Sequence, residues 1–514
     1  MYPGTFAAST PDQPAVIMGQ SGEVVTYGEL DERSARLAQL LYARGLRPGG
    51  KIAILAENHP RFYEVYWAAM RSGLYLTTVN RYLAPAEAAY LVNDSGATVC
   101  ITTAQMAPIA VPMLELIPDC PIRLMMDGVE DGFESYEAAL HASAAEPLAD
   151  QPRGMVMLYS SGTTGQPKGI ERPLSGIQVD DPTAAGMSSV LRSMLGMNEH
   201  SVYLCPAPLY HAAGLQWSSG THELGGTVVL MEKFDAEQFL ILVEREAVTH
   251  TQVVPTMLVR LMKLPPEVRD RFDLSSLECV VHAAAPCPIE VKHQVIEWLG
   301  PIVHEYFAAT EGNGMTFISA DDWLRHPGSV GRPLLGIPHI CDEYGAELAV
   351  GETGLIYFEQ EHTPFEYHGD PEKTRASRHP DHDNWSALGD VGYMDEDGYM
   401  YLTDRKAFTI ISGGVNIYPA EIEACLIMHP TVTDVAVFGL PDPEMGEYVH
   451  AVVQPAEGVD GSTELVEELI AYARQHLARY KVPRQIDFRA ELPRLPTGKL
   501  YKQGLRDEYR KAMA

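Results

Sequence analysis

The chain of 514 residues has little positive charge and no run of lysine and arginine. Its 38 basic residues are outnumbered by 69 acidic ones, which gives a formal net charge of −31 at pH 7. A field of this sign repels nucleic acid and anionic membrane surfaces. We therefore expect neither as a partner, and we interpret the acidity as charge spread over a solvated surface.

Long apolar runs and paired cysteines are also missing. No segment approaches about 18 uninterrupted apolar residues, and the N-terminal Met-Tyr-Pro-Gly has neither a basic nor an apolar signal region. The seven cysteines are scattered, without a Cys-x-x-Cys pair. These absences predict buried thiols and a cytoplasmic protein without stable membrane insertion, and they leave a homodimer open.

Strand-like and helix-like segments alternate through the first half of the chain. Thr26-x-x-Glu29 is a capping box ahead of leucines at helical spacing, and Gly45 stands where a C-cap glycine would. The apolar run 51–55 predicts a buried strand, and 62–71 predicts a helix. Further strands are expected at 97–102, 202–205, 227–230, 251–254 and 280–283, and a helix at 239–247. Such alternation predicts a largely parallel sheet of the α/β class.

From about residue 351 the sequence changes to short strands between Gly and Asp turns. We place a domain boundary near Asp404, so that 1–403 form the N-terminal domain and 404–514 a compact α+β domain. The expected elements are strands at 354–358, 391–394, 399–403, 432–438 and 449–453, and a helix at 464–480. The segment His379-Pro-Asp-His-Asp383 is interpreted as a solvated loop in preference to a metal site.

The richest chemical signal is the segment Tyr159-Ser-Ser-Gly-Thr-Thr-Gly-Gln-Pro-Lys-Gly169. Its glycines let backbone N–H groups approach an anion, its hydroxyls add donors, and Lys168 adds charge. It is not a Walker A loop, because Pro167 stands five residues after Gly162 and Lys168 is followed by glycine. The segment therefore predicts a phosphate-binding loop outside the P-loop kinases and GTPases.

Four other segments carry candidate chemistry, and each has a plainer interpretation alone. His211 after a strand is a pocket residue or a half-buried histidine. Phe307-Ala-Ala-Thr-Glu311 offers an aromatic face, a hydroxyl and a carboxylate, which suits a nucleotide with Mg²⁺, but a Thr-Glu pair also begins helices. Asp390 lies in a turn where a carboxylate could accept hydrogen bonds from a ribose. Lys499, on a loop with two prolines, is a site residue or a solvated one.

Taken together and in this order, these segments resemble the adenylate-forming superfamily of acyl-CoA synthetases, adenylation domains and firefly luciferase. The resemblance covers nearly the whole chain. Its most specific elements are Tyr159 to Gly169, Tyr401-Leu-Thr-Asp-Arg405 and Ile410-Ile-Ser-Gly-Gly414-Val-Asn-Ile-Tyr-Pro-Ala-Glu-Ile-Glu423. It implies an α/β fold in which a large N-terminal domain of layered α/β subdomains, with a β-barrel-like subdomain, precedes a small mobile α+β domain.

The resemblance also implies a role for each matching residue. The β- and γ-phosphates of ATP would be held by Ser160, Ser161, Gly162, Thr163, Thr164, Gly165 and Lys168, with Thr163 near the metal. The nucleotide would also contact Ala284, Ala285, Pro286, Phe307, Ala308, Ala309, Asp390 and Arg405, the last two at the ribose. Thr310 would touch the α-phosphate, Glu311 would bind Mg²⁺, and Lys499 would bridge the α-phosphate and the attacking carboxylate. The acyl and CoA path would be lined by His211, Val254, Ala283, Gly312, Gly413 and Gly414.

The implied reaction has two steps. A carboxylate is a weak nucleophile facing an anionic phosphate, so catalysis must neutralise charge and fix an in-line geometry. The products are acyl-AMP and pyrophosphate, and the CoA thiol then attacks the mixed anhydride after the C-terminal domain has rotated. Departures from the family pattern are Ala407 and Phe408 at the pivot, Phe307-Ala308 for the usual Tyr-Gly, and Val415 for a common glutamate. The pivot residues bear on the rate or balance of domain alternation, and not on the chemistry.

We therefore expect an AMP-forming acid:CoA ligase that uses ATP, Mg²⁺ and CoA. Amino-acid adenylation is disfavoured because Tyr210-His-Ala-Ala-Gly-Leu-Gln-Trp217 has no aspartate to bind an amino group. Delivery of the acyl group to a carrier protein stays open, since one fold serves several acceptors. A non-catalytic acyl- or nucleotide-binding relative is disfavoured by the joint presence of Lys499, Glu311 and Thr163. The small residues of the acyl segments, with Gly314, predict a roomy apolar pocket for a fatty, alicyclic or aromatic acid.

Overall fold

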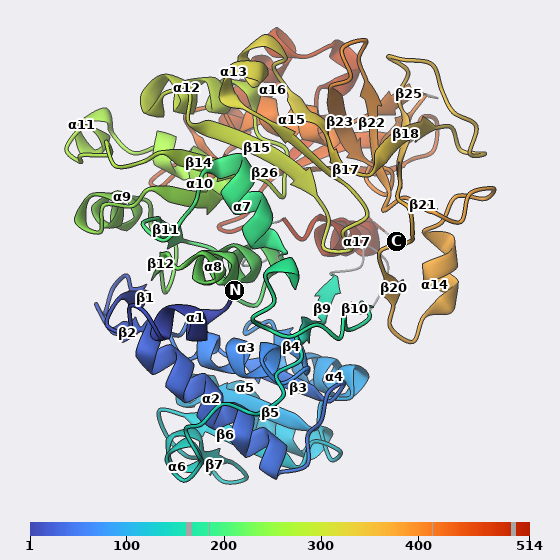
Figure 1. Ribbon diagram of the computed structural model, residues 1–514. Coiled ribbons are helices and arrows are strands. Elements are labelled where there is room, and N and C mark those ends of the chain that lie inside the picture. The colour runs from blue at the N-terminus through green and yellow to red at the C-terminus, as the bar shows by residue number, and fades with distance from the viewer. Residues whose placement is uncertain (161–166, 185, 414, 495–499, 514) are drawn as a thin grey trace. The chain divides into compact units, whose positions relative to one another are not determined.

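The structure is a computed structural model that describes residues 1–514 except 161–166, 185, 414, 495–499 and 514. The chain divides into two compact units, whose helices and strands are labelled in Figure 1. The first unit comprises Met1–Val253, Lys263–Val281 and Phe365–Thr374, and the second comprises Val254–Met262, His282–Pro364 and Arg375–Ala514. None of the helices in the described ranges combines the length and apolarity needed to cross a bilayer.

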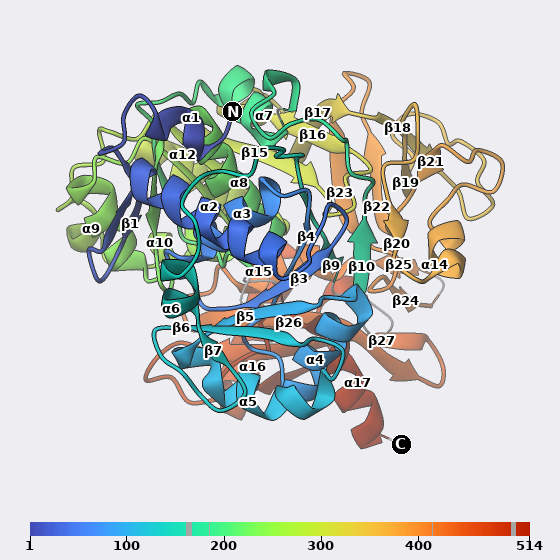
Figure 2. The same cartoon turned by 60° about the horizontal axis from the view of Figure 1, so that its bottom comes forward.

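The first unit contains a parallel sheet in the order β7-β6-β5-β3-β4-β8, with the short edge strands β7 (Glu134–Ser135) and β8 (Met155–Val156). Its central strands are β3 (Lys51–Leu55), β4 (Tyr75–Val79), β5 (Val99–Thr103) and β6 (Ile122–Met126). In Figure 2, helices α4 (Pro85–Ser95) and α5 (Ala107–Met113) cover one face, while α2 (Tyr27–Ala43) and α3 (Phe62–Met70) lie on the other. The strands are apolar without a break because both faces of this sheet are buried. The strands expected at 51–55 and 97–102 and the helix expected at 62–71 are confirmed.

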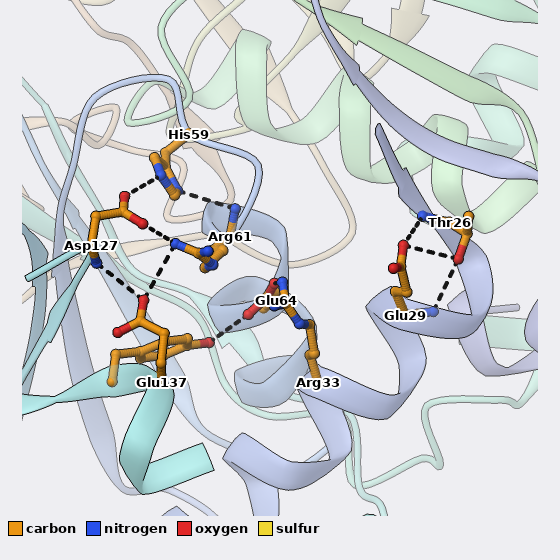
Figure 3. A network of polar contacts seen from close by, with 9 residues as sticks. Thr26, Glu29, Arg33, His59, Arg61, Glu64, Asp127 and Glu137 are labelled. Carbon is orange, nitrogen blue, oxygen red and sulfur yellow. Dashed lines mark hydrogen bonds and ion pairs between the residues drawn. The ribbon is translucent and has the colours of Figure 1, made fainter. Parts of the chain in front are cut away.

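The start of α2 has the predicted capping box. Glu29 N donates to Thr26 Oγ1 at 3.2 Å, and Thr26 N donates to Glu29 Oε2 at 2.9 Å (Figure 3). Gly45 has a φ of +97° immediately after the helix ends, as a C-cap glycine requires. Both ends of α2 are therefore set by local sequence.

A second polar network in Figure 3 joins the start of α3 to the end of β6 and to α6 (Tyr136–His141). Arg61 pairs with Asp127 and lies 3.3 Å from Glu137, while His59 bonds Asp127 at 2.8 Å. Glu64 is fully buried and is satisfied by Arg33 and by the Tyr136 hydroxyl, at 2.8 and 2.9 Å. Burial raises the pKa of Glu64, which Arg33 opposes. The network fixes the loops that leave this sheet.

The first unit also contains a sheet in the order β14-β13-β11-β12-β1-β2. The strands are β1 (Pro14–Met18), β2 (Val24–Thr26), β11 (Val202–Cys205), β12 (Thr227–Leu230), β13 (His250–Val253) and β14 (Cys279–His282). The predicted strands are confirmed to within one residue at each end. The predicted helix at 239–247 is α9, which covers Ala236–Arg245, and α8 (Ala212–Leu224) connects β11 with β12.

The second unit is rich in antiparallel strands. They follow the order β18-β19-β22-β23-β17-β16-β15, with β21 (Trp385–Ser386) beside β19. Their bounds are β15 Val303–Ala308, β16 Met315–Ile318, β17 Ser329–Leu335, β18 Ile337–Cys341, β19 Gly354–Glu359, β22 Asp390–Met394 and β23 Met400–Arg405. Helices α10 (Pro255–Met262) and α12 (Ile289–Leu299) belong to the same unit. The change to short strands predicted from residue 351 is confirmed.

The C-terminal part of this unit has its own apolar core. Strands β24 (Ile410–Ser412), β25 (Val415–Ile417), β26 (Val432–Asp442), β27 (Gly446–Pro455) and β28 (Gln485–Phe488) form one sheet. Helices α15 (Pro419–Leu426) and α16 (Thr463–His476) pack on it through Ile422 and Leu469. Helix α17 (Lys502–Met513) packs through Leu505 against a separate cluster on Phe438. The mixed α/β class with a small α+β domain is confirmed.

Two sequence expectations need correction. The helix predicted at 464–480 ends at His476, because its C-cap residue Leu477 has an extended backbone. The loop at 379–383 is exposed at residues 380–383, as expected, but His379 is buried, bonds the Gly345 carbonyl at 2.8 Å and lies with His382 against the Trp385 ring. The seven cysteines are free thiols as predicted, five buried and two partly buried.

Acid should weaken the first unit through His222. This residue is fully buried on α8, where its Nδ1 accepts from Trp67 Nε1 at 3.3 Å and its Nε2 donates to the Ala15 carbonyl at 3.1 Å. Burial lowers the pKa of His222 to about 4, below its ordinary value of 6.5. The unfolded chain therefore takes up the proton first, so stability is complete above pH 6.5 and falls as the pH drops toward 4. Between pH 7 and pH 5 we expect a loss of about 2 kcal/mol from this group.

Urea unfolding followed by tryptophan fluorescence at pH 7 and pH 5 would measure this loss. His222→Gln keeps a donor and an acceptor but cannot titrate, so its free energy of unfolding should change less between the two pH values than that of the parent. His200→Gln, at an exposed position, is the matched control and should behave like the parent. An equal pH dependence in the parent and in His222→Gln would contradict the assignment.

Candidate functional site

The phosphate-loop segment is framed by two paired strands of the first unit. Strand β9 (Leu158–Ser160) pairs antiparallel with β10 (Lys168–Glu171), which places Ser160 opposite Lys168. Lys168 Nζ lies 3.4 Å from Asp370 Oδ2. The backbone N–H of Lys373 and the Lys168 ammonium both lower the pKa of Asp370. The predicted binding residues Ser161, Gly162, Thr163, Thr164 and Gly165 lie outside the described residues.

Packing explains Gly169 at the end of this segment. A Cβ there would lie 2.5 Å from Met157 Cε, and the Gly169 carbonyl accepts from His368 N at 2.8 Å. Tyr159 at the other end donates to Asp94 Oδ2 at 2.8 Å, and burial raises the pKa of Tyr159. The two strands are thus anchored outside the loop that they frame.

His211 occupies the N-cap position of α8, directly after the buried Tyr210. The two rings are 4.4 Å apart, and the Tyr210 carbonyl accepts from Thr78 Oγ1 at 2.8 Å. Gly214 lets the first turn of the helix approach Pro208, whose carbonyl oxygen would lie 2.5 Å from a Cβ at that position. His211 is half-buried at a helix N-terminus, which both sequence interpretations allow.

In the second unit, Phe307 and Ala308 are the last two residues of β15. The turn that follows is formed by Ala309, Thr310 and Glu311. Glu311 is only 7% exposed, and Gly312 has a φ of +70°. Two carbonyls of this turn, those of Gly312 and Asn313, accept hydrogen bonds from Gln360 Nε2. The turn is therefore fixed by the fold.

The segment Ala283–Pro286 follows β14 and contains an unusual backbone. Ala284 has a φ of +76°, although it carries a Cβ, and such conformations persist where the surroundings impose them. Ala283 is buried and Ala284 exposed. Val254, at the start of α10, is buried in the same unit. The segment thus presents bare backbone and small side chains.

Next to this segment is a buried charge pair that no sequence pattern predicted. Lys292 on α12 is fully buried, and its Nζ lies 2.5 Å from Glu305 Oε2 on β15 and 4.6 Å from the Trp323 ring centroid. Burial lowers the pKa of Lys292 and raises that of Glu305, while their mutual attraction opposes both shifts. His282 Nε2 is 3.4 Å from the same carboxylate, and burial lowers its pKa well below 6.5. The pair ties α12 to β15 just before Phe307.

The ribose candidates Asp390 and Arg405 lie opposite each other on β22 and β23. Arg405 Nε is 3.2 Å from Asp390 Oδ1. Gly389, with a φ of +89°, makes the turn before Asp390. Residues 15 positions apart in the chain are therefore brought together, which their spacing alone did not require.

The remaining candidates belong to residues 404–514. Gly413 has a φ of +57°, and Met445 Cε would lie 2.4 Å from a Cβ there. At the pivot, the Ala407 carbonyl accepts from Arg506 Nη1 at 2.9 Å, and the Phe408 ring faces Lys502 and Arg506 of α17. Gly414 and Lys499 lie outside the described residues.

One expectation about the acyl pocket is wrong. Gly314 does not leave space, because a Cβ built there would lie 2.2 Å from the Phe358 ring, which fills the position. Phe358 also lies beside Phe307, with ring centroids 6.4 Å apart. The glycine is a packing requirement and gives no information about the acid.

The donor set fits a magnesium ion that is held mainly by phosphates. In the part of the chain that the structure describes, no three His, Cys, Asp or Glu side chains converge to form a metal cluster. Mg²⁺ in nucleotide sites typically takes one or two carboxylates with phosphate oxygens and waters. The single buried carboxylate of Glu311, on a fixed turn, is of that kind.

Comparison with known proteins identifies the family. The AMP-binding enzyme family matches residues 5–367, and the AMP-binding enzyme C-terminal domain matches residues 421–499. The chain is 34% identical over 520 residues to a feruloyl-CoA synthase of an Amycolatopsis species, which covers 99% of this chain and 98% of the relative. It is 31% identical over 511 residues to a fatty acid–[acyl-carrier-protein] ligase of Streptomyces coeruleorubidus, covering 98% and 95%.

A solved structure agrees with the sequence comparison. The amide bond synthetase of Marinactinospora thermotolerans superposes with a TM-score of 0.82 at 29% identity, over 99% of both chains. The whole length of the chain is therefore accounted for by one architecture. The chain belongs to the AMP-binding enzyme family, and it is an adenylate-forming ligase.

Proposed function

We propose that this ligase activates a fatty, alicyclic or aromatic carboxylic acid with ATP and transfers the acyl group to CoA. The observation that carries the proposal is the buried Glu311 carboxylate on a fixed turn, in the same unit as the small-residue segment Ala283–Pro286 and the Asp390–Arg405 pair. Enzymes of this family use ATP, Mg²⁺ and CoA. The relatives support the aromatic and the fatty classes, since one acts on ferulate and another on fatty acids.

Each nucleotide contact follows from the chemistry of its residue. Phe307 offers a ring face to adenine, flanked by Ala284, Ala285, Pro286, Ala308 and Ala309. Asp390 accepts from the ribose hydroxyls while Arg405 orients it. Lys168 and the donors from Ser160 to Gly165 bind the β- and γ-phosphates. Mg²⁺, when bound at Glu311 and near Thr163, neutralises phosphate charge and stabilises the departing pyrophosphate.

Transfer of the adenylyl group from ATP to the carboxylate needs positioning more than proton transfer. The carboxylate must approach an anionic phosphorus in line with the leaving oxygen, so donors must offset the charge that builds up on the equatorial oxygens. Thr310 donates to the α-phosphate, and Lys499 draws the carboxylate and the phosphate together. Proximity of this kind supplies much of the rate enhancement.

Transfer to CoA uses residues of the smaller domain. We propose that 404–514 rotate relative to 1–403 between the two steps, so that Lys499 leaves and Gly413 and Gly414 line the pantetheine path. The separate core around Ile422 and Leu469, and a C-terminal family match that begins at residue 421, support this division. His211, Val254, Ala283 and Gly312 are proposed to line the acyl side.

A carrier protein is the alternative acceptor, and the Streptomyces coeruleorubidus relative favours it as a candidate. The first step would be unchanged, because the acceptor enters only after acyl-AMP has formed. We also propose a cytoplasmic location, where ATP and CoA are available, and a homodimer as the assembly to be tested.

Acids of different size should be activated at different rates. Pyrophosphate release should be faster with medium-chain fatty, benzoic or hydroxycinnamic acids than with acetate, because Val254, Ala283 and Gly312, which are proposed to line the acyl side, are small and uncharged. A panel of acids of graded size, each assayed with and without CoA, measures this. Best turnover on acetate would contradict the pocket assignment, and thioester formed on a carrier protein but not on CoA would select the alternative acceptor.

A single substitution at Lys499 should separate the two steps. Lys499→Ala should slow pyrophosphate release from acid and ATP by at least about a hundredfold, as expected when one charge-stabilising group is removed. Thioester formation from supplied acyl-AMP should be largely intact, because Lys499 is proposed to leave before that step. Lys511→Ala, at an exposed position of α17, is the control and should leave both rates unchanged. Equal loss of both steps in Lys499→Ala would refute the assigned role.

A further inference from the structure

Gln360 makes an unusual pair of contacts with the turn that carries Glu311. It follows β19, and its Nε2 donates to the Gly312 carbonyl at 2.9 Å and to the Asn313 carbonyl at 2.7 Å. A side-chain amide has two N–H donors, and both are used here. Since carbonyls only accept hydrogen bonds, the two partners also fix which end of the amide faces the turn.

The turn and Gln360 are held to the same pair of strands. Gln360 N donates to the Asn384 carbonyl at 3.2 Å, and Asn384 Nδ2 donates back to the Gln360 carbonyl at 3.0 Å. From the turn itself, Asn313 Nδ2 donates to the Ser386 carbonyl at 3.2 Å. Asn384 and Ser386 flank Trp385 on β21, which pairs with β19. Two amide side chains therefore fasten the turn to the β19–β21 pair.

This fastening acts on the residues next to Glu311. Gly312 has a left-handed backbone, so the direction of the chain after Glu311 depends on a conformation that glycine alone does not fix. Hydrogen bonds to the next two carbonyls select one conformation. Residues that orient a metal ligand without touching the metal commonly alter metal affinity about tenfold or more when they are changed.

We propose that Gln360 is a positioning residue that sets the Glu311 carboxylate for the divalent cation bound with ATP. The inference rests on the proposed role of Glu311 in binding Mg²⁺. Gln360 acts through the backbone of Gly312 and Asn313 and touches neither the metal nor the nucleotide. Its loss should therefore weaken binding of the metal–nucleotide complex more than it weakens the fold.

The chain offers a matched control for a merely structural role. Gln13 Nε2 also donates to two backbone carbonyls, those of Gly225 at 2.6 Å and Glu199 at 3.2 Å, in the first unit. Gly225 caps the end of α8 opposite to His211, so none of the proposed site residues is adjacent to this contact. Gln13→Glu and Gln360→Glu thus each replace an amide that donates to two backbone carbonyls by a carboxylate of nearly the same shape.

Calorimetric titration of the protein with ATP, without acid and at several Mg²⁺ concentrations, tests the proposal. In Gln360→Glu a carboxylate oxygen faces the two carbonyls, and the Kd for Mg²⁺·ATP should rise about tenfold. Gln360→Met removes the N–H donors without adding charge, and its Kd for Mg²⁺·ATP should also rise. Gln13→Glu should bind Mg²⁺·ATP with a Kd within about twofold of that of the parent, even if its melting temperature falls as much as that of Gln360→Glu.

The outcomes distinguish this inference from the proposed function. An unchanged Kd in Gln360→Met, or an equal rise in Gln13→Glu, would overturn the positioning role. If the parent binds Mg²⁺·ATP but releases pyrophosphate with no acid in the panel, the proposed reaction fails while the role of Gln360 stands. If Glu311→Gln leaves the Mg²⁺ dependence of ATP binding unchanged, the role of Gln360 is overturned together with that of Glu311.

Discussion

A strongly acidic chain must bind a polyanion, and the candidate site depends on how that charge is offset locally. With a formal net charge of −31, the long-range field opposes the approach of ATP, although physiological salt screens it beyond about 8 Å. Affinity must come from groups in contact with the phosphates. Lys168, which is proposed to bind the phosphates, and Arg405, which is proposed to act at the ribose, are cations already oriented by Asp370 and Asp390, so their side chains need little further ordering. Backbone donors and the metal would supply the remainder.

Two polar contacts, one buried and one partly buried, hold the segment 307–311, which is proposed to bind the nucleotide, from opposite ends. The Lys292–Glu305 pair fixes the base of β15, and Gln360 fixes the turn that ends at Asn313. Phe307 to Glu311 lie between these anchors. A buried ion pair stabilises a fold weakly at best, because desolvation offsets attraction, but breaking one is costly. Its value here is positional, as a functional site requires rigid support.

Sequence reasoning succeeded where the signal was local. Thr26 and Glu29 bond each other across one helical turn, so their spacing was sufficient, and Gly45 needed only its own backbone conformation. It failed where distant residues decide. Gly314 suggested an open pocket, but Phe358 occupies the space, and His379 suggested a solvated loop, but Trp385 covers it. The predicted helix ran to residue 480, whereas α16 ends at His476, which shows that periodicity indicates a helix better than it indicates where the helix ends.

The sequence by itself determined the order of motifs, and with it the family, the two-step reaction class and the charged groups available, because these depend on residue type and spacing. Tertiary structure alone decided which groups meet. Lys168 pairs with Asp370, Lys292 pairs with Glu305, and Gln360 donates to Gly312. In each case no local sequence pattern predicts that the two residues meet. The physical reason is that the fold brings strands and helices that are separate in the sequence side by side. Lys292 and Glu305 are buried, where each needs a partner that only the folded chain can provide, while Lys168 and Asp370 meet at a partly exposed position.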